Sequence, residues 1–204
     1  MPEQFSLLFE PKKVSRVVVF DLETLRSAGE VGGWENIHRM GMACGVCYDS
    51  LDQEFHVYDE KDVPLLIEHL QRADLIVGFN HIRFDYRVLS GYTRFNYSAL
   101  PNFDILQDVE RILGFRLKLD SLAKSTLGET KSADGLQSLR WVKEGRLDLV
   151  REYCKKDVDV TKKLFESGAQ KNFVTYEHNG LPTKIPVQWK IDDLIRARQT
   201  RSRP

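Results

Sequence analysis

Hydrophobic residues along the first half of the chain gather in short runs, and each run predicts a strand. The run VVVFDLET at 17–24 opens with four consecutive apolar residues, as expected of a strand that protein covers on both faces. Further runs at 40–48, 54–58 and 74–80 predict three more strands. The strand at 54–58 follows a turn and alternates in polarity, so we expect it to form a hairpin with the strand before it.

Helical spacing appears between these strands and dominates the second half. It predicts helices at 62–72 and 83–91 and a largely helical stretch through Phe165. Between the second helix and this stretch we expect a brief strand that ends at Asp104. Antiparallel strands followed by alternating strands and helices predict an α/β fold, in which helices flank a mixed sheet on both faces. We expect one domain over 1–204, with a core at about 14–168 and a C-terminal extension at 169–204 that contains short extended pieces.

The last long helix is predicted at 145–165. Tyr153 and Asp157 lie one turn apart on a partly buried flank of it. Asp159 is about 200° around the helix from Asp157, so we expect it to lie in solvent. The stripe that faces the core consists of Leu147, Val150, Cys154, Val158, Thr161 and Phe165, and Val160 and Leu164 continue the neighbouring row.

Charge changes this picture only locally. The 204 residues are 42% hydrophobic and carry 30 basic and 30 acidic side chains, so the formal net charge is zero and does not itself indicate a nucleic-acid partner. Between 111 and 146, however, eight basic residues face four acidic ones, a surplus of four. The last fifteen residues hold five basic and two acidic ones. These segments predict either a basic track or a solvated helix face and a frayed tail.

Three cysteines, an odd number, argue against a disulfide scaffold. Cys44 and Cys47 form a C-x-x-C motif, but positions three apart on a strand face opposite sides, so we expect core packing rather than a redox or zinc site. No apolar run is long enough to span a membrane, and the first thirteen residues lack the order of a signal peptide. We therefore expect a cytoplasmic protein without a membrane partner.

Four acids stand where the predicted elements converge. Asp21 and Glu23 are two apart on a strand and share one face. Asp85 ends the stretch NHIRFD, where a buried strand meets a helix, and Asp157 comes from the late helix. Strand ends are often polar, and one acid there can simply cap a helix. If all four converge, their repulsion calls for hard divalent cations such as Mg²⁺.

The order of these motifs resembles a known family. D-x-E in the first strand, N-x-x-x-F-D in the middle and Y-x-x-x-D in a late helix are similar to the three motifs of the DEDD 3′-to-5′ exonucleases, which have a ribonuclease H-like fold. Tyr153 stands four residues before Asp157, as in the tyrosine class, whereas Glu152 occupies the position of the histidine in the other class. The stretch GLQSLRWVKEGRLDLVREYCKKD resembles the bacterial YprB-type branch, found alone or attached to helicases.

The resemblance implies a site. Two Mg²⁺ or Mn²⁺ ions would be held by Asp21, Glu23, Asp85 and Asp157, and Tyr153 would orient the attacking water. Thr24, Leu25, Asn80 and Phe84 would contact the terminal nucleotide, although Phe84 could be pure core and Asn80 could close its own turn. His81 is expected to be a loop residue without a catalytic role.

The resemblance also implies the activity. The protein would be a 3′-to-5′ exonuclease that hydrolyses terminal phosphodiesters of single-stranded nucleic acid with two metal ions and releases nucleoside 5′-monophosphates. The alternative is a catalytically weak nucleic-acid-binding module that works with a helicase or another nucleic-acid enzyme. An endonuclease or integrase on the same fold is disfavoured by the late Y-x-x-x-D motif.

Overall fold

The central sheet of the protein has five strands in the order β3-β2-β1-β4-β5. A computed structural model describes residues 14–129 and 135–201. The strands are β1 (Val17–Thr24), β2 (Met42–Asp49), β3 (Glu54–Asp59), β4 (Leu75–Gly78) and β5 (Asn102–Asp104). β1 pairs antiparallel with β2 and parallel with β4, and β5 is parallel to β4. This mixed sheet confirms the α/β class and the ribonuclease H-like arrangement.

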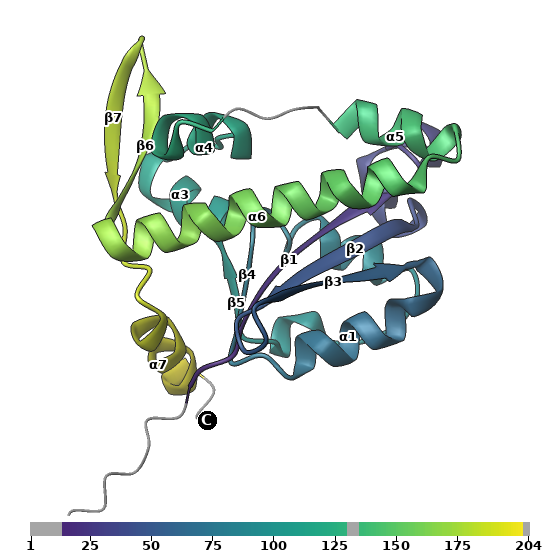
Figure 1. Ribbon diagram of the computed structural model, residues 1–204, viewed down its shortest axis with the longest axis horizontal. Coiled ribbons are helices and arrows are strands. Elements are labelled where there is room, and N and C mark those ends of the chain that lie inside the picture. Colours follow the sequence, from purple (N-terminus) through teal and green to yellow (C-terminus); the bar gives the residue numbers. More distant parts are fainter. Residues whose placement is uncertain (1–13, 130–134, 202–204) are drawn as a thin grey trace, which may run out of the picture.

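Helices cover both faces of the sheet (Figure 1). The long helix α6 crosses β1, β2 and β4 on one face, and α1 and α2 pack on the other. The helices are α1 (Val63–Gln71), α2 (Asp85–Leu89), α3 (Ile105–Leu113), α4 (Leu119–Leu127), α5 (Gly135–Lys143), α6 (Leu147–Lys171) and α7 (Ile191–Arg201). Short 3₁₀ helices lie at η1 (Gly29–Val31), η2 (Trp34–Arg39), η3 (Glu60–Asp62) and η4 (Tyr97–Ala99).

The side-chain alternation of β1 separates two hydrophobic cores. Val17 and Val19 point to the face covered by α6, whereas Val18, Phe20 and Leu22 point to the face covered by α1 and α2. All five side chains are buried, as the unbroken apolar run predicts for a strand with protein on both sides.

The cysteines confirm the same alternation. Cys44 belongs to the core beneath α6, and Cys47 belongs to the opposite core. Both are buried free thiols, as is Cys154. The expectation that Cys44 and Cys47 pack in the core is therefore confirmed.

The second half differs from the sequence prediction in detail. Among the described residues, the stretch expected to be largely helical contains the four helices α3 to α6, and α6 continues past Phe165 to Lys171. Asp159, expected in solvent, is only partly exposed because Lys163 lies 2.9 Å away, and Lys163 also pairs with Glu129 beyond the end of α4. The long aliphatic stem of lysine lets such a pair cover a helix flank.

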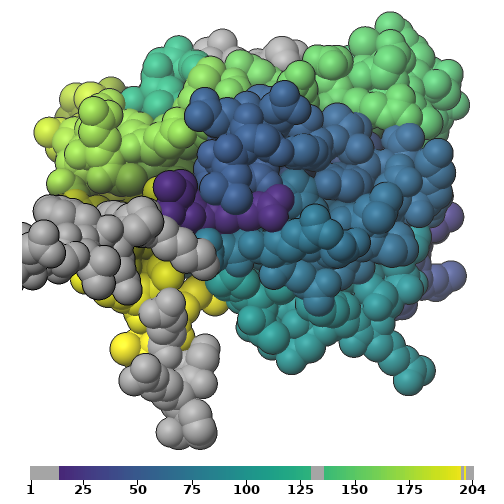
Figure 2. Space-filling model, turned by 60° about the horizontal axis from the view of Figure 1, so that its bottom comes forward, coloured from purple at the N-terminus to yellow at the C-terminus, as the bar shows by residue number. Residues whose placement is uncertain are grey.

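The C-terminal residues pack onto the α6 face. β6 (Phe173–His178) and β7 (Leu181–Pro186) form the expected extended pieces as a hairpin beside α4, and α7 follows them (Figure 1). Figure 2 shows α7, in yellow, near the purple residues at the start of β1. Trp189 is fully buried, and its indole Nε1 donates to Asp108 Oδ2 at 2.8 Å. No helix within 14–129 or 135–201 is long and apolar enough to cross a membrane.

Some positions considered in the sequence analysis lie outside the described residues. They are Lys131 and Asp134 in the basic stretch, Arg203 in the tail, and the whole of 1–13. Of the four-residue surplus at 111–146, the described side chains retain seven basic residues against three acids, which leaves the surplus unchanged.

The contact between Gly168 and Trp189 generates a stability prediction. A Cβ atom at Gly168 would lie 2.2 Å from Trp189 Cε3, so Gly168→Ala must displace a buried indole. We expect the free energy of unfolding to fall by about 1–3 kcal/mol in a denaturant titration. Gly29→Ala is the matched control, because its Cβ would meet no heavy atom closer than 4.0 Å. Equal unfolding midpoints for the two variants would contradict the packing described here.

Candidate active site

Three carboxylates meet where α6 passes the carboxyl end of β1. Asp21 and Glu23 continue the β1 face that carries Val17 and Val19, so they point toward α6. Asp157 reaches them from α6. Oxygen atoms of Asp21, Glu23 and Asp157 lie within 4.8 Å of one another, with Asp157 buried and the other two half-buried. The structure thus brings together three of the four acids that the sequence singled out.

Tyr153 lies one turn before Asp157 on α6 and is also buried. Its ring meets Trp141 of α5 edge-on, with centroids 6.2 Å apart. Burial raises the pKa of Tyr153 well above the ordinary value, and the nearby carboxylates of Asp157 and Glu23 raise it further. The phenol therefore keeps its proton at neutral pH and can donate a hydrogen bond beside the carboxylates.

The packing of α6 fixes this placement. Cys154 and Val158, the residues that follow Tyr153 and Asp157, are fully buried in the core against β1. Cys154 Sγ lies 3.5 Å from the backbone oxygen of Asp21. Neighbouring helix positions differ by about 100°. The packing of Cys154 and Val158 on the sheet therefore turns Tyr153 and Asp157 toward the carboxyl end of β1.

Asp85, the fourth acid, takes a different position. It opens α2, is only 2% exposed, and accepts a hydrogen bond from the backbone N–H of Leu22 at 3.0 Å. Asp85 thus contacts the strand between Asp21 and Glu23. Within 14–129 and 135–201, however, its oxygen atoms do not belong to the group formed by Asp21, Glu23 and Asp157. Burial raises the pKa of Asp85 to about 8, although backbone hydrogen bonds oppose the shift.

The loop before Asp85 depends on a residue that sequence reasoning passed over. Asp104, at the end of β5, accepts hydrogen bonds from the backbone N–H groups of Asn80 at 2.8 Å and Ile82 at 3.2 Å. It also caps α3 through Leu106 N at 3.0 Å and Gln107 N at 3.3 Å. An aspartate directly before a helix is a recognisable N-cap signal. The N–H groups of Asn80 and Ile82, however, are far from Asp104 in the sequence, so no local pattern predicts these two bonds.

The four residues expected to contact the terminal nucleotide differ in their surroundings. Thr24 is buried beside an irregularity in the β1–β2 pairing, and Leu25 packs against the α6 core. Asn80 has a φ of 67°, and its side-chain oxygen accepts from Arg116 at 2.7 Å rather than from its own turn. Phe84 is half-buried and lies edge-on to Trp34.

His81 sits in the turn at 81–84 but is fully buried rather than at the surface. Its Nδ1 lies 3.6 Å from Asp104 Oδ2, and burial lowers its pKa to about 4. The ring is therefore neutral at neutral pH and belongs to the support of the loop.

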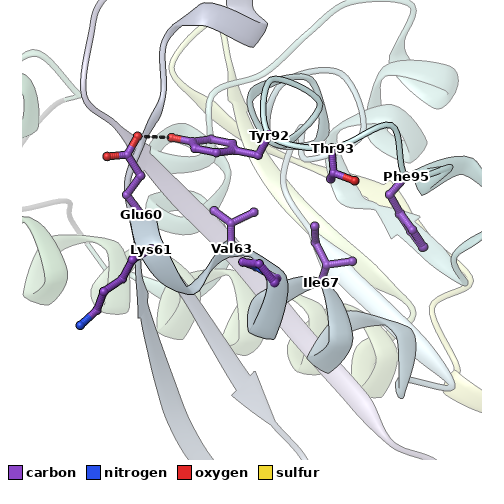
Figure 3. A pocket seen from close by; sticks show the side chains of 8 residues that line it. Glu60, Lys61, Val63, Ile67, Tyr92, Thr93 and Phe95 are labelled. Carbon is purple, nitrogen blue, oxygen red and sulfur yellow. Dashed lines mark hydrogen bonds between the residues drawn. The ribbon is translucent and has the colours of Figure 1, made fainter.

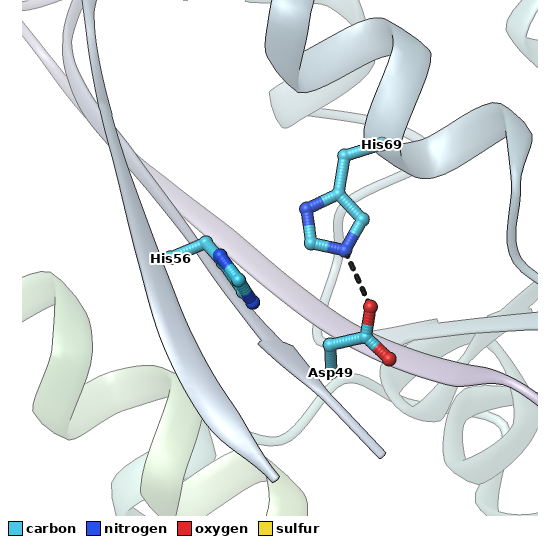
Figure 4. A group of neighbouring side chains, drawn as sticks. All are labelled: Asp49, His56 and His69. Atoms are coloured by element: carbon cyan, nitrogen blue, oxygen red, sulfur yellow. Dashed lines mark hydrogen bonds and ion pairs between the residues drawn. The ribbon is translucent and has the colours of Figure 1, made fainter. Parts of the chain in front are cut away.

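A second group of possible ligands lies at the other end of the sheet. Figure 4 shows Asp49, His56 and His69 converging, and Asp49 pairs with Val18 near the start of β1. Asp49 Oδ2 already accepts from Arg16 Nε at 2.7 Å and contacts His69 Nε2 at 2.8 Å. A guanidinium on the same oxygen disfavours a metal cation there, so we interpret the group as a structural network.

A hollow of about 560 Å³ lies between η3, α1 and the chain at 92–95 (Figure 3). Tyr92 closes one side of it by donating to Glu60 Oε1 at 2.6 Å. None of the acids considered above lines it; the lining residues are Glu60, Lys61, Val63, Pro64, Ile67, Tyr92, Thr93 and Phe95.

Comparison with known proteins agrees with the fold and the order of the motifs. A family profile described as 3′-5′ exonuclease, of the DNA polymerase A type, matches residues 6–167. The match covers most of the chain, and the protein therefore belongs to this 3′-5′ exonuclease family. Members of the family typically are metal-dependent hydrolases that act on nucleic acid.

Solved structures support the fold. The chain is similar to the family B DNA polymerase from the hyperthermophilic archaeon Pyrobaculum calidifontis, with 18% sequence identity and a TM-score of 0.55. The similarity covers 78% of this chain and 24% of the polymerase chain, so this protein spans about a quarter of that enzyme's length. No curated protein matches the chain in sequence.

The close carboxylates generate a prediction about stability. Three acids within 4.8 Å repel one another when no cation is bound. We expect Asp157→Asn to melt at or above the wild-type temperature in chelator, gaining up to about 1 kcal/mol. Adding Mn²⁺ should raise the wild-type midpoint by mass action and the mutant midpoint much less.

Asp159→Asn is the matched control, since Asp159 lies on the same helix but pairs with Lys163. It should respond to Mn²⁺ as the wild type does. If Asp157→Asn is clearly destabilised in chelator and gains as much from Mn²⁺ as the wild type, Asp157 is a structural acid and not part of a cation site.

Proposed function

We propose that this protein is a metal-dependent 3′-to-5′ exonuclease that hydrolyses the terminal phosphodiester of single-stranded nucleic acid and releases nucleoside 5′-monophosphates. The observation that carries the proposal is the group formed by Asp21, Glu23 and Asp157. This group lies at the carboxyl end of a central strand, and α/β folds commonly assemble their functional sites there.

The donor set fits Mg²⁺ or Mn²⁺. All three side chains offer carboxylate oxygens, the ligands that these hard cations prefer. When bound, a pair of such ions supplies charge neutralisation at the attacking and leaving oxygens and acidifies a water molecule. Asp21, Glu23 and Asp157 would hold one ion. Asp21 would also hold the second, which Asp85 would reach through water, since Asp85 stands apart from the other oxygens and contacts Leu22.

Tyr153 has a positioning role in this proposal. Burial and the neighbouring carboxylates raise the pKa of its phenol in the metal-free protein, so orienting a water molecule suits this side chain better than taking a proton from it. A protonated phenol beside Asp157 can instead hydrogen-bond to the attacking water and orient it toward the phosphorus atom.

Four residues around the carboxylates are proposed to contact the terminal nucleotide. Thr24 ends β1 directly after Glu23, and Leu25 follows it. Asn80 directly precedes the turn at 81–84, and Phe84 is the last residue of that turn before Asp85. Arg116 bonds to the side chain of Asn80 and places a guanidinium from the locally basic 111–146 stretch at this turn, where it can meet a phosphate.

The position of Tyr153 supports membership of the tyrosine class, and the 135–157 stretch supports the YprB-type branch. A helicase or other nucleic-acid enzyme is the partner that this branch suggests. The alternative function, a catalytically weak binding module for such a partner, makes the same contacts with nucleic acid but predicts no turnover.

The direct test uses 5′-labelled single-stranded DNA and RNA oligonucleotides with Mg²⁺ or Mn²⁺. We expect a ladder of products shortened from the 3′ end and its near-complete loss in Asp21→Ala. Asp159→Asn should keep the activity. A single internal cut, or cleavage that survives chelation, contradicts the exonuclease proposal, and binding without cleavage favours the alternative.

The role of Tyr153 has its own test. Tyr153→Phe removes only the hydroxyl, so turnover should fall by about 10- to 1,000-fold while the midpoint shift caused by Mn²⁺ stays near the wild-type value. A loss of the Mn²⁺ shift would instead mean that the hydroxyl holds the carboxylates in place.

A further inference from the structure

Trp34 stands out among the three tryptophans of the chain. It is 67% exposed, whereas Trp189 is fully buried and Trp141 is half-buried. Single exposed apolar residues are common on protein surfaces, so exposure alone means little. The surroundings of Trp34, however, are not those of an ordinary surface residue.

The first feature is its place in the fold. Beyond Thr24 the backbone pairing of β1 with β2 continues through Leu25 N to Gly41 O at 3.0 Å and Arg26 N to Met40 O at 3.1 Å. The connection that carries Trp34 therefore projects from the end of β1 that bears Glu23. Its indole meets Phe84 edge-on, with centroids 6.4 Å apart, and Phe84 precedes Asp85. Trp34 thus lies at the margin of the carboxylate site.

The second feature is that the backbone around Trp34 is held in place. Arg87 Nη2 of α2 donates to the backbone oxygen of Glu35 at 3.0 Å. Gly91 packs so closely on His38 that a Cβ would lie 1.9 Å from the His38 carbonyl oxygen. These contacts join the connection at 25–41, the Trp34 loop, to α2, the helix that begins with Asp85. An aromatic ring presented by a backbone fixed in advance loses little conformational entropy when a ligand binds.

The third feature is uncompensated positive charge. Arg26, Arg39 and Arg87 are exposed, and across 14–129 and 135–201 no carboxylate lies within ion-pair distance of them. Arg26 and Arg87 donate instead to backbone carbonyl oxygens. Of the two acids in the same loop, Glu30 pairs with Lys143 at 3.0 Å and Glu35 is exposed, so the three arginines outnumber the one remaining acid. Exposed aromatic faces interleaved with free cations are typical of surfaces that bind single-stranded nucleic acid.

We propose that Trp34 is a stacking site for a nucleobase of a single strand whose 3′ end lies at the carboxylates. The edge-on contact with Phe84 and the high exposure leave a face of the indole open to a base, and the neighbouring arginines meet the phosphates on either side. Because Trp34 lies outside the carboxylate group, the stacked base is upstream of the terminal nucleotide. This inference rests on the proposed function, and Trp34 is a binding residue rather than a catalytic one.

The first test measures binding without cleavage. A 5′-fluorescein-labelled oligothymidylate is titrated in chelator with the wild type, Trp34→Ala, Trp34→Phe and Leu181→Ala, and anisotropy is read. We expect affinity about 5- to 100-fold weaker for Trp34→Ala and largely retained for Trp34→Phe. Leu181 is the control because it is 69% exposed but lies in the β6–β7 hairpin, away from α5 and the end of β1 (Figure 1); its variant should bind like the wild type.

The second test locates the stacked base. A series of oligonucleotides carries one abasic nucleotide at successive positions from the 3′ end. The wild type should lose affinity strongly at one upstream position, and this position-specific loss should disappear in Trp34→Ala because the variant has no ring to stack. The same series in RNA establishes whether the site accepts both sugars.

The outcomes separate this inference from the proposed function. Wild-type affinity in Trp34→Ala, an abasic profile that the variant shares with the wild type, or no measurable binding by the wild type would each overturn the stacking site. A wild type that binds and stacks but does not cleave with Mn²⁺ leaves the stacking site standing and contradicts the nuclease. If cleavage occurs, Trp34→Ala should raise KM without a matching fall in kcat.

Discussion

The placement of carboxylates at the end of a strand buried on both faces is the constraint on which the rest of this structure depends. β1 gains its rigidity from two separate cores, because alternate valines point into each. That rigidity holds Asp21 and Glu23 close together although like charges repel. An isolated loop would relieve the repulsion by moving, whereas a central strand cannot move without disturbing both cores.

The same constraint explains the length and placement of α6. The helix contacts β1, β2 and β4, so its register on the sheet is fixed by many buried side chains rather than by the site itself. Cys154 and Val158 pack against the sheet. As a result, Tyr153 and Asp157 are turned toward the carboxyl end of β1. The energy that positions Tyr153 and Asp157 thus comes from apolar burial elsewhere along the helix.

A second layer of polar contacts supports the site from the opposite face. Asp104 joins the end of β5, the start of α3 and the turn that leads to Asp85 through four backbone N–H groups. Asp85 in turn holds the N–H of Leu22. This chain of contacts connects three strands of the sheet at their carboxyl ends, and the Trp34 loop is attached to the same helix α2. The Trp34 loop and the turn before Asp85 are therefore both attached to α2.

The sequence by itself determined the class of fold and most strands and helices, and it singled out the four candidate acids, because each of these depends on a local pattern. Apolar runs, helical spacing and the D-x-E and Y-x-x-x-D motifs depend only on residues near one another in the chain. Tertiary structure alone decided that Asp21, Glu23 and Asp157 share one group while Asp85 stands beside Leu22. It also decided that α6 extends to Lys171, that Asp159 is covered by an ion pair, and that Trp34 lies by Phe84. These features depend on distances between segments far apart in sequence, and such distances follow from the packing of two cores rather than from any local pattern.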